Sequence, residues 1–412
     1  MVGLEIVRNI VGVVARMASK LAPLDEKFRI ANRLDGPFAK GPCLWMHGAS
    51  LGECKMLLGL AKILTEEISD LPPILVTTQK VEVESFLSPL AARCGASISI
   101  APLDTPRGMK CFLETAKPLM LVLAENELWP GFLSAMRHRF RFPSVALISG
   151  RFYRCLSAES FSCIGFISMQ TAADLSRFMA ASDYLVSAKA IVGGDWKLLP
   201  WAMSVVGNFE KPEPLVDAAF LSFHREELKA LVEMLELAMS AGEAVAVAPR
   251  FESEVPFFRE AFAARNLPMV EWPAVKRGAV SLVTVYGKLS EVLRISRSAV
   301  VGGSFARSLG VHDFWEPLRM NVPTCIGPYF RGQREAVRSL LHEKALAQIQ
   351  KPSEFLNRNF PPAENVERFL SREREKILSS YEAFRRFVES VLGRNGVSGD
   401  ALSKSKQMES SK

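Results

Sequence analysis

The chain has 412 residues, of which 49% are hydrophobic, so it is too long for one ordinary core and too apolar to be a disordered chain. Its formal net charge of +7 comes without an arginine-rich run or an aromatic-basic motif, which argues against nucleic acid as a partner and favours an anionic membrane surface. The seven cysteines and five histidines show no metal-binding or disulfide spacing, which predicts a reducing cytoplasm and no metal site.

The first segment with a clear pattern, residues 4–24, predicts an amphipathic helix. Its charge-free apolar run is far shorter than the roughly 20 residues that a membrane span requires. Two interpretations stand side by side: a helix that lies on a membrane surface, and a helix that packs on its own domain. The apolar positions at helical spacing include Leu4, Val7, Val11 and Val14.

A strand at residues 43–47 is followed by a loop of small residues and a helix that starts near Glu53. The spacing Ser50-x-x-Glu53 predicts a capping box, in which Glu53 returns a hydrogen bond to the backbone of Ser50. A helix N-terminus also favours a charged carboxylate, and the small residues leave room for a substrate. From spacing alone the cap is the preferred interpretation.

Two further strands end in charged side chains. The apolar run 119–124 leads into Glu125 and Glu127, and paired carboxylates at a strand end are costly to bury unless they bind something. A functional role is therefore expected at least as much as a solvated loop. The strand 144–148 leads to Arg151, which is either a contact for an anionic sugar or lipid phosphate, or a surface arginine.

The second half of the chain repeats this arrangement. The short strand 298–301 stops at two glycines and a serine, where freed peptide N–H groups and close backbone approach suit a phosphate. An ordinary strand-to-helix turn would use the same glycines for tight geometry. The candidate ligand-binding residues of this stretch are Gly302, Gly303, Ser304, His312 and Glu316.

Several of these segments resemble motifs of the 3-deoxy-D-manno-octulosonic acid (Kdo) transferases, over roughly residues 40–345. The segment 49–53 is similar to the family's Ala-Ser-x-Gly-Glu, and 125–130 is similar to Glu-Thr-Glu-Leu-Trp-Pro. The segment 302–328 resembles the donor-binding run with Gly-Gly-Ser, Gly-x-His-Asn, Glu-Pro and Gly-Pro. Departures occur on the donor side, where Phe251, Lys288 and Asp313 replace the family's His, Glu and Asn.

The alternation of strands and helices predicts an α/β fold with two doubly wound, Rossmann-like domains facing a cleft, and the resemblance implies the GT-B plan. We expect an amphipathic N-terminal helix at 1–30, an acceptor-binding domain at 31–198 and a nucleotide-sugar donor domain at 199–392. A disordered tail is expected at 393–412, which is rich in Ser, Gly and Lys.

The resemblance implies a glycosyltransferase that moves Kdo from CMP-Kdo to a lipid A precursor at the cytoplasmic face of the bacterial inner membrane. Glu53 would be the general base, with Glu125 and Glu127 lining the cleft near the acceptor or the donor sugar, and Ser50 and Arg151 on the acceptor. On the donor side, Gly302, Gly303 and Ser304 would hold the phosphate, Glu316 the ribose, and Arg250 and His312 the remaining donor groups. No cofactor is expected, and no metal, because CMP leaves with a single phosphate.

Two alternatives stay open. The changed donor loops favour a transferase or epimerase of the same plan that uses another sugar nucleotide. A non-catalytic membrane-surface scaffold descended from such an enzyme is the other, and the presence of Glu53 argues against it.

Overall fold

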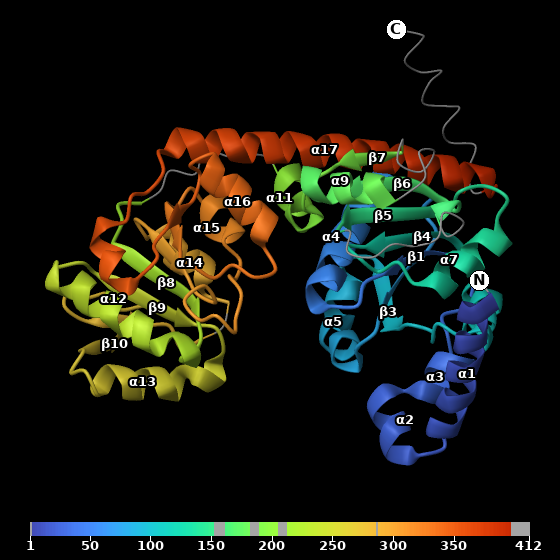
Figure 1. Cartoon of the computed structure of the whole chain (residues 1–412), viewed down its shortest axis with the longest axis horizontal. Coiled ribbons are helices and arrows are strands. Elements are labelled where there is room, and N and C mark those ends of the chain that lie inside the picture. Colours follow the sequence, from blue (N-terminus) through green and yellow to red (C-terminus); the bar gives the residue numbers. More distant parts are fainter. Residues whose placement is uncertain (1, 152–160, 182–188, 205–211, 286, 397–412) are drawn as a thin grey trace, which may run out of the picture. The chain divides into compact units, whose positions relative to one another are not determined.

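The computed structural model describes residues 2–151, 161–181, 189–204, 212–285 and 287–396. These residues form two compact units (Figure 1). The first unit runs to Val205 and resumes at Arg374, and the second unit occupies Val206–Glu373. Each unit is a parallel sheet with helices on both faces, so the predicted fold class of two doubly wound α/β domains is confirmed.

The sheet of the first unit has seven parallel strands in the order β3-β2-β1-β4-β5-β6-β7. Its central strands are buried because helices hide both faces, which explains their continuous apolar runs. The strands are β1 Cys43–His47, β2 Ile74–Thr78, β3 Ala96–Ile100, β4 Pro118–Ala124, β5 Val145–Gly150, β6 Ile164–Met169 and β7 Ala190–Val192. The helices are α1 Val2–Ala18, α2 Ala22–Phe28, α3 Ile30–Asp35, α4 Leu51–Glu67, α5 Val81–Arg93, α6 Pro106–Ala116, α7 Pro130–Arg139, α9 Ala172–Ala181, the 3₁₀ turn η1 Trp196–Leu198, and α11 Leu199–Met203.

The second unit repeats the plan with the strand order β10-β11-β9-β8-β12-β13-β14, again all parallel. Its strands are β8 Ala218–Phe223, β9 Val245–Pro249, β10 Met269–Glu271, β11 Val280–Leu282, β12 Ala299–Val301, β13 Thr324–Ile326 and β14 Ala347–Gln348. Its helices are η2 Arg225–Glu227, α12 Leu228–Ser240, η3 Glu252–Glu254, α13 Val255–Ala263, α14 Leu289–Arg294, α15 Trp315–Arg319, α16 Arg334–His342 and η4 Pro352–Asn357.

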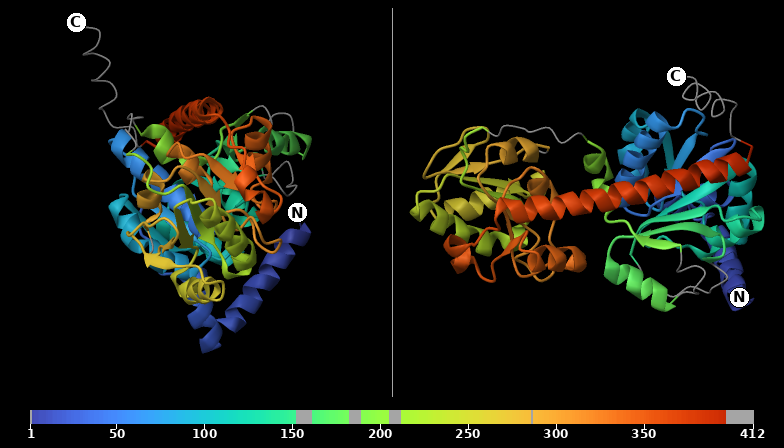
Figure 2. Two further views of the ribbon diagram at one scale, coloured as in Figure 1. Left: turned by 90° about the vertical axis from the view of Figure 1, so that its left-hand side faces the viewer. Right: turned by 90° about the horizontal axis from the view of Figure 1, so that it is seen from above.

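The long helix α17 (Ala363–Arg394) begins in the second unit and ends in the first (Figures 1 and 2). Phe384 packs against Phe166 and Trp196 at ring-centroid distances of 5.5 and 5.3 Å. Ser380 lies 2.8 Å from Ser168, and a Cβ at Gly193 would lie 2.2 Å from the Ser380 hydroxyl oxygen, so a glycine is required there. The prediction that the C-terminal domain runs to 392 is therefore wrong, because this packing places residues after Glu373 with the first unit.

Other boundaries differ by a few residues. The predicted helix 4–24 is broken, since α1 ends at Ala18 and α2 begins at Ala22. The start of the second domain near 199 lies within seven residues of Val206. The predicted disordered tail begins one residue before the end of α17, and its residues 397–412 lie outside the described part of the chain.

Helix α1 is joined to the first unit by one face, and its large apolar side chains from Val7 onward are exposed to solvent. The Arg8 guanidinium lies 3.3 Å from the Asp104 carboxylate, and Gly12 lies against Thr105. The apolar residues of this helix and its continuation are exposed by 40% or more: Val7, Ile10, Val11, Val13, Val14, Met17, Leu21, Leu24 and Phe28. Helix α1 thus packs on its own domain through Arg8 and Gly12, while the apolar side chains described from Val7 onward remain exposed, so both interpretations of the sequence stay open.

Candidate functional site

The strand order of the first unit reverses between β1 and β4, and the predicted site residues of this unit follow those two strands. In open parallel sheets, ligands bind outside the carboxyl ends of the strands at such a switch point. Strand β1 ends at His47 and leads through Gly48–Ser50 into α4, while β4 ends at Ala124 and leads into Glu125. The fold thus places Ser50, Glu53, Glu125 and Glu127 at the carboxyl end of the central strands.

Glu53 forms the capping box that its spacing predicts. One carboxylate oxygen accepts from the N–H groups of Ala49 at 2.7 Å and Ser50 at 3.3 Å, and the other accepts from the Ser50 hydroxyl at 2.8 Å. Gly48 makes this arrangement possible, because a Cβ there would lie 2.8 Å from the Cβ of Glu53. These hydrogen bonds fix the carboxylate at the helix N-terminus.

Glu125 stands in a left-handed backbone conformation, with φ of 48°, and is 8% exposed. Its carboxylate forms an ion pair with Lys197, and Arg151 lies 3.8 Å away. Burial raises the pKa of Glu125, although Lys197 and Arg151 act in the opposite direction by favouring the carboxylate. A strained, desolvated acid between two cations is typical of a functional site.

Lys197 lies between Glu125, with which it forms an ion pair, and Gly52 at the start of α4. Its Cε lies 3.5 Å from the point where a Cβ of Gly52 would stand. Burial lowers the pKa of Lys197, but Asp195 and Glu125 raise it by more, so the ammonium form is favoured. In the sequence, Lys197 lies near the expected domain boundary. No local pattern predicts its ion pair with Glu125, which is 72 positions away.

Glu127 has different partners from Glu125. Its carboxylate accepts from the Trp129 indole N–H at 2.6 Å and lies 3.5 Å from Nε2 of His47. His47 is fully buried, and its Nδ1 lies 2.9 Å from the Thr77 hydroxyl. The sequence gives no reason to select His47, which is simply the last residue of an apolar strand.

Glu53 and Glu127 both lie near the end of β1, because Glu127 contacts His47, the last residue of that strand, and Glu53 stands in the first turn of the helix that follows it. Burial raises the pKa of Cys54 to about 12, a hydrogen bond to Thr78 opposes this, and the charges of Glu53 and Glu127 add to the rise. The site therefore collects three carboxylates around the end of β1, of which Glu125 is neutralised by cations.

Arg151 follows β5 and is held in place by Gln170. Its Nε donates to the Gln170 side chain at 2.8 Å, and Gln170 in turn donates to the hydroxyl of Ser149 at 3.0 Å. Since Arg151 also lies near Glu125, the predicted acceptor residue belongs to the same cluster as the predicted catalytic acid.

The strand order of the second unit reverses between β8 and β12, where the Gly-Gly-Ser turn stands. Glu227, only 1% exposed, fills this turn: its carboxylate accepts from the N–H groups of Gly303 at 2.8 Å, Phe305 at 2.9 Å and His224 at 3.0 Å. The Gly302 N–H is bonded to the neighbouring strand at Leu221.

The expectation of free N–H groups at Gly302 and Gly303 is therefore wrong, since a carboxylate of the chain already accepts one of them. The Ser304 hydroxyl is likewise used internally, donating to Val301 at 2.5 Å and accepting from the Gly327 N–H at 2.9 Å. Gly303, with φ of 73°, is needed because a Cβ there would lie 2.2 Å from the carbonyl oxygen of Gly310 and 2.8 Å from the His312 ring. Contact of these three residues with a phosphate stays a prediction.

His312 lies beside His224, with 2.6 Å between their Nε2 atoms. Burial lowers the pKa of His312 to about 4, with Arg250 and His224 adding to the effect, so this imidazole is neutral at neutral pH. The charge of Arg250 thus acts on His312, and contact of either residue with the donor stays a prediction.

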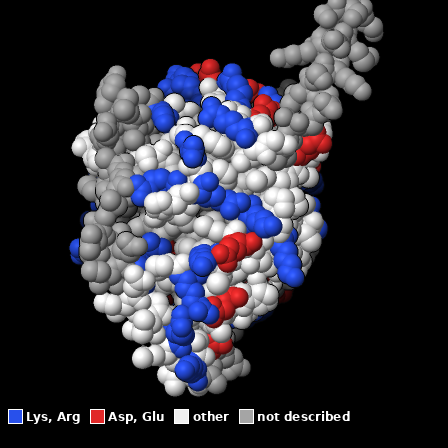
Figure 3. Space-filling model, turned by 90° about the vertical axis from the view of Figure 1, so that its right-hand side faces the viewer, with Lys and Arg blue, Asp and Glu red and all other residues white. Residues whose placement is uncertain are grey.

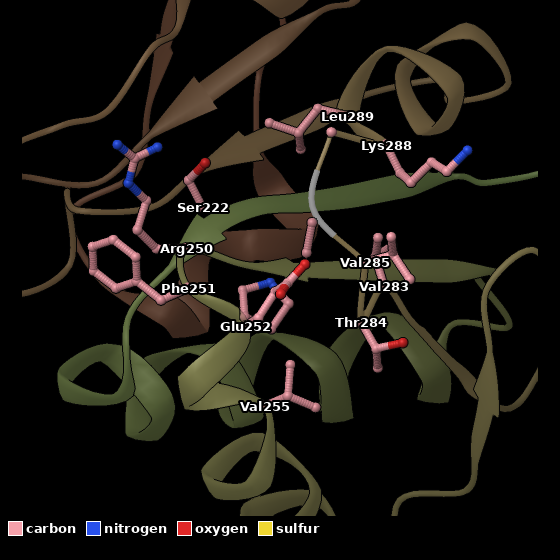
Figure 4. Close-up of a pocket in the computed structure, with 13 residues that line it drawn as sticks. Ser222, Arg250, Phe251, Glu252, Val255, Val283, Thr284, Val285, Lys288 and Leu289 are labelled. Atoms are coloured by element: carbon pink, nitrogen blue, oxygen red, sulfur yellow. The ribbon is translucent and has the colours of Figure 1, made fainter. Parts of the chain in front are cut away.

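A pocket opens at the carboxyl ends of β8, β9 and β11 (Figure 4). Arg250 and Lys288 lie on opposite sides of it, and Val255 and Val283 are among its apolar lining residues. A mainly apolar hollow with a few charged groups at its rim is the common form of a small-molecule site.

Glu316 stands in the first turn of α15, apart from this pocket's lining. Burial raises its pKa, Asp313 raises it further, and Arg319 opposes both. Asp313, the departure from the family's Asn, accepts from the N–H groups of Trp315 at 2.9 Å and Glu316 at 3.3 Å. Its carboxylate therefore caps a helix, a role that an Asn side chain could also fill.

Residues 22–198 match the family model described as 3-Deoxy-D-manno-octulosonic-acid transferase (kdotransferase). The 3-deoxy-D-manno-octulosonic acid transferase of Chlamydia pneumoniae is 25% identical over 327 residues, which cover 73% of this chain and 73% of that protein. The protein of the same name from Aquifex aeolicus is 24% identical over 323 residues, covering 76% of this chain and 84% of its own. The solved C-terminal CMP-Kdo binding domain of WaaA from Acinetobacter baumannii is 20% identical, with a TM-score of 0.31, and covers 42% of this chain and 90% of that domain.

Proposed function

Because this chain belongs to the Kdo transferase family, we propose that it transfers Kdo from CMP-Kdo to a lipid A precursor in lipopolysaccharide biosynthesis. The observation that supports the proposal is that the motif residues Glu53, Glu125 and Glu127 all follow β1 or β4, the two strands at the switch point of the first unit. These residues come from two separate motifs, and a scaffold without catalysis would have no need to keep them together.

In the proposed reaction, the Glu53 carboxylate takes the proton of an acceptor hydroxyl as that oxygen bonds to the anomeric carbon of Kdo. The bond from this carbon to the CMP phosphate oxygen breaks, and the electron pair leaves with CMP. Glu53 accepts three hydrogen bonds from the protein, and a carboxylate has about four acceptor positions, so one position remains for the incoming proton.

The cations of the first unit suit an anionic substrate. Lys197 and Arg151 stand on either side of Glu125, and their spacing is set by that carboxylate. We assign Arg151 to the acceptor side, where a lipid phosphate could take part of its charge, and Ser50 to the positioning of Glu53. Glu125 would then hold the two cations in place until substrate arrives.

On the donor side, we assign Arg250 and His312 to the anionic part of CMP-Kdo. A neutral His312 can donate or accept a hydrogen bond without adding charge. Gly302, Gly303 and Ser304 would contribute a close backbone approach, and Glu316 would accept from ribose hydroxyls. The pocket beside Arg250 offers an apolar surface for the rest of the nucleoside.

We place the reaction at the cytoplasmic face of the inner membrane, with α1 as the contact to lipid. Its row of exposed valines, Val7, Val11 and Val14, forms an apolar face of the kind that enters a headgroup region. On the face of the first unit drawn in Figure 3, Lys and Arg cover much more of the surface than Asp and Glu, which suits anionic headgroups. Within the described residues, no helix combines the length and apolar character needed to cross a bilayer.

The test is transfer of radiolabelled Kdo from CMP-Kdo to a lipid A precursor by the purified chain, with Glu53→Gln as the inactive control. Labelled product from the parent alone is the expected result. Absence of product from a folded parent that turns over a UDP-sugar would instead support the alternative, an epimerase or transferase with another donor.

A further inference from the structure

Three potential metal ligands meet in the second unit, although they are not recognisable by spacing in the sequence. His224 follows β8, Glu226 stands in η2, and Glu254 ends η3. Their ligand atoms all lie within 4.8 Å of one another, and Nδ1 of His224 is 3.8 Å from Oε2 of Glu254. The pairing of residues 30 positions apart is produced by the neighbouring strands β8 and β9.

Glu254 has an unmet need for a positive partner. Its Oε2 is shielded from solvent and has no hydrogen-bond donor among the described residues. Burying a carboxylate oxygen without a donor is costly, and the adjacent Glu227 shows the contrast, since three N–H groups satisfy it. The 3.8 Å separation from His224 is too long for a direct hydrogen bond.

The contact between His224 and His312 suits a metal-binding imidazole. With 2.6 Å between the two Nε2 atoms, one of them must carry a proton and donate it. If His224 is the donor, its Nδ1 carries a lone pair, which lies 3.8 Å from Oε2 of Glu254 and also within reach of the Glu227 N–H, so a metal ion would compete with that N–H. A histidine that binds a metal through one nitrogen commonly donates a hydrogen bond from the other. Phe251 packs edge-on against the His224 ring, at 5.4 Å, and holds its orientation.

We propose that His224, Glu254 and Glu226 bind one divalent transition-metal ion of the zinc class. Mixed imidazole and carboxylate ligands suit such an ion better than Mg²⁺ or Ca²⁺, which take oxygen ligands alone. Three protein ligands leave a fourth position for water. Glu226 is free to turn inward, because its only described ion pair, 3.6 Å to the adjacent Arg225, joins two exposed side chains and is worth little.

The experiment uses the full chain without a histidine tag, stripped with EDTA and titrated with Zn²⁺ in competition with a chromophoric chelator. One equivalent of bound Zn²⁺ is expected. Glu254→Gln keeps the side-chain shape but loses the charge, and should weaken Zn²⁺ binding at least about tenfold. His138→Gln, at an exposed histidine in the other unit, is the matched control and should bind as the parent does.

Either of two binding results would overturn the site, as would the spectroscopic result given below: no saturable equivalent of Zn²⁺, or a Glu254→Gln variant that binds as tightly as the parent. Glu226→Gln alters an exposed side chain, so it separates loss of a ligand from loss of folding. Co²⁺ added in place of Zn²⁺ should give the intense visible absorption of four-coordinate Co²⁺. If His224 is instead doubly protonated at pH 7.5 in the ¹⁵N spectrum, a proton occupies the position of the metal. These measurements need neither donor nor acceptor, so they stand apart from the proposed transfer reaction.

Discussion

The Glu227 carboxylate accepts a 2.8 Å hydrogen bond from the N–H group of Gly303. Glu227, the residue before α12, thus occupies the glycine turn that the sequence suggests as a phosphate-binding site. The turn is shaped from within the protein, and a donor phosphate would meet its outer surface and the side chains around it.

Glu227→Gln tests this arrangement. The amide nitrogen of glutamine would face peptide N–H groups that need an acceptor, so we expect a loss of about 1 to 3 kcal/mol in the free energy of unfolding. Urea denaturation measures it, and Glu226→Gln on the adjacent exposed residue should stay within about 0.5 kcal/mol of the parent. Equal stability of the two variants would show that the turn does not depend on Glu227.

Glu53→Gln and Ser50→Ala separate catalysis from helix capping. Loss of the cap hydroxyl in Ser50→Ala should cost about 0.5 to 2 kcal/mol of stability. Glu53→Gln keeps much of the capping geometry but cannot take a proton, so turnover should fall about 10² to 10⁴-fold while CMP binding persists. Single-turnover Kdo transfer and calorimetric CMP titration measure the two effects. Near-parental transfer by Glu53→Gln would move the base assignment to Glu127 or Glu125.

Lys197→Met removes the principal counterion of Glu125. A largely buried carboxylate left with only Arg151 at 3.8 Å should lower the free energy of unfolding by about 2 kcal/mol, less than for a fully buried pair because Lys197 is 34% exposed. Lys62→Met, at a lysine with an exposed partner, is the matched control. The double variant Lys197→Met with Glu125→Gln should recover part of the loss. Failure of that recovery would mean that the pair is not the origin of the effect.

The lowered pKa of His312 makes stability depend on pH. In the folded chain the imidazole stays neutral down to about pH 4, whereas in the unfolded chain it binds a proton below about pH 6.5. The unfolded state therefore holds more protons between these values, and stability falls as the pH falls from 6.5 towards 4. The contribution of this partly exposed group should be on the order of 1 kcal/mol after solvent screening. We would measure the urea midpoints of the parent and of His312→Gln at pH 7.0 and pH 4.5, in EDTA. The midpoint of the parent should fall more between these two pH values than the midpoint of the variant. An equal fall in both proteins would contradict the assignment.

Replacing Val7, Val11 and Val14 of α1 by Asp should abolish binding to anionic liposomes. The three side chains are about half exposed, so the changes spare the core and add charge to the lipid-facing surface. Phe86→Asp, at a 65% exposed residue of α5, is the control for adding a charge elsewhere. Co-sedimentation of the triple variant at the parental level would show that membrane contact lies outside α1.

Local sequence patterns predicted the strands and helices well, because the burial of each element requires apolar residues at regular positions along the chain. The apolar run ending at Glu125 is β4, and Ser50 with Glu53 forms the expected cap. Contacts between distant positions could not be predicted, because neither partner carries a periodic signal. Lys197 reaches Glu125 from 72 positions away, and Glu227 reaches Gly303 from 76. Both are polar contacts that can form only after the sheets have assembled and brought the two partners together.

The passage of α17 from one unit to the other affects the order in which the chain can fold during synthesis. The second unit is continuous and is complete once residue 373 has left the ribosome. The first unit begins earlier but must wait for Tyr381 and Phe384, which cover Trp196. The N-terminal domain therefore finishes last, contrary to the usual vectorial order. A fragment that stops near residue 205 would expose an aromatic surface to water, so dissection of this protein must carry the last helix along with the first domain.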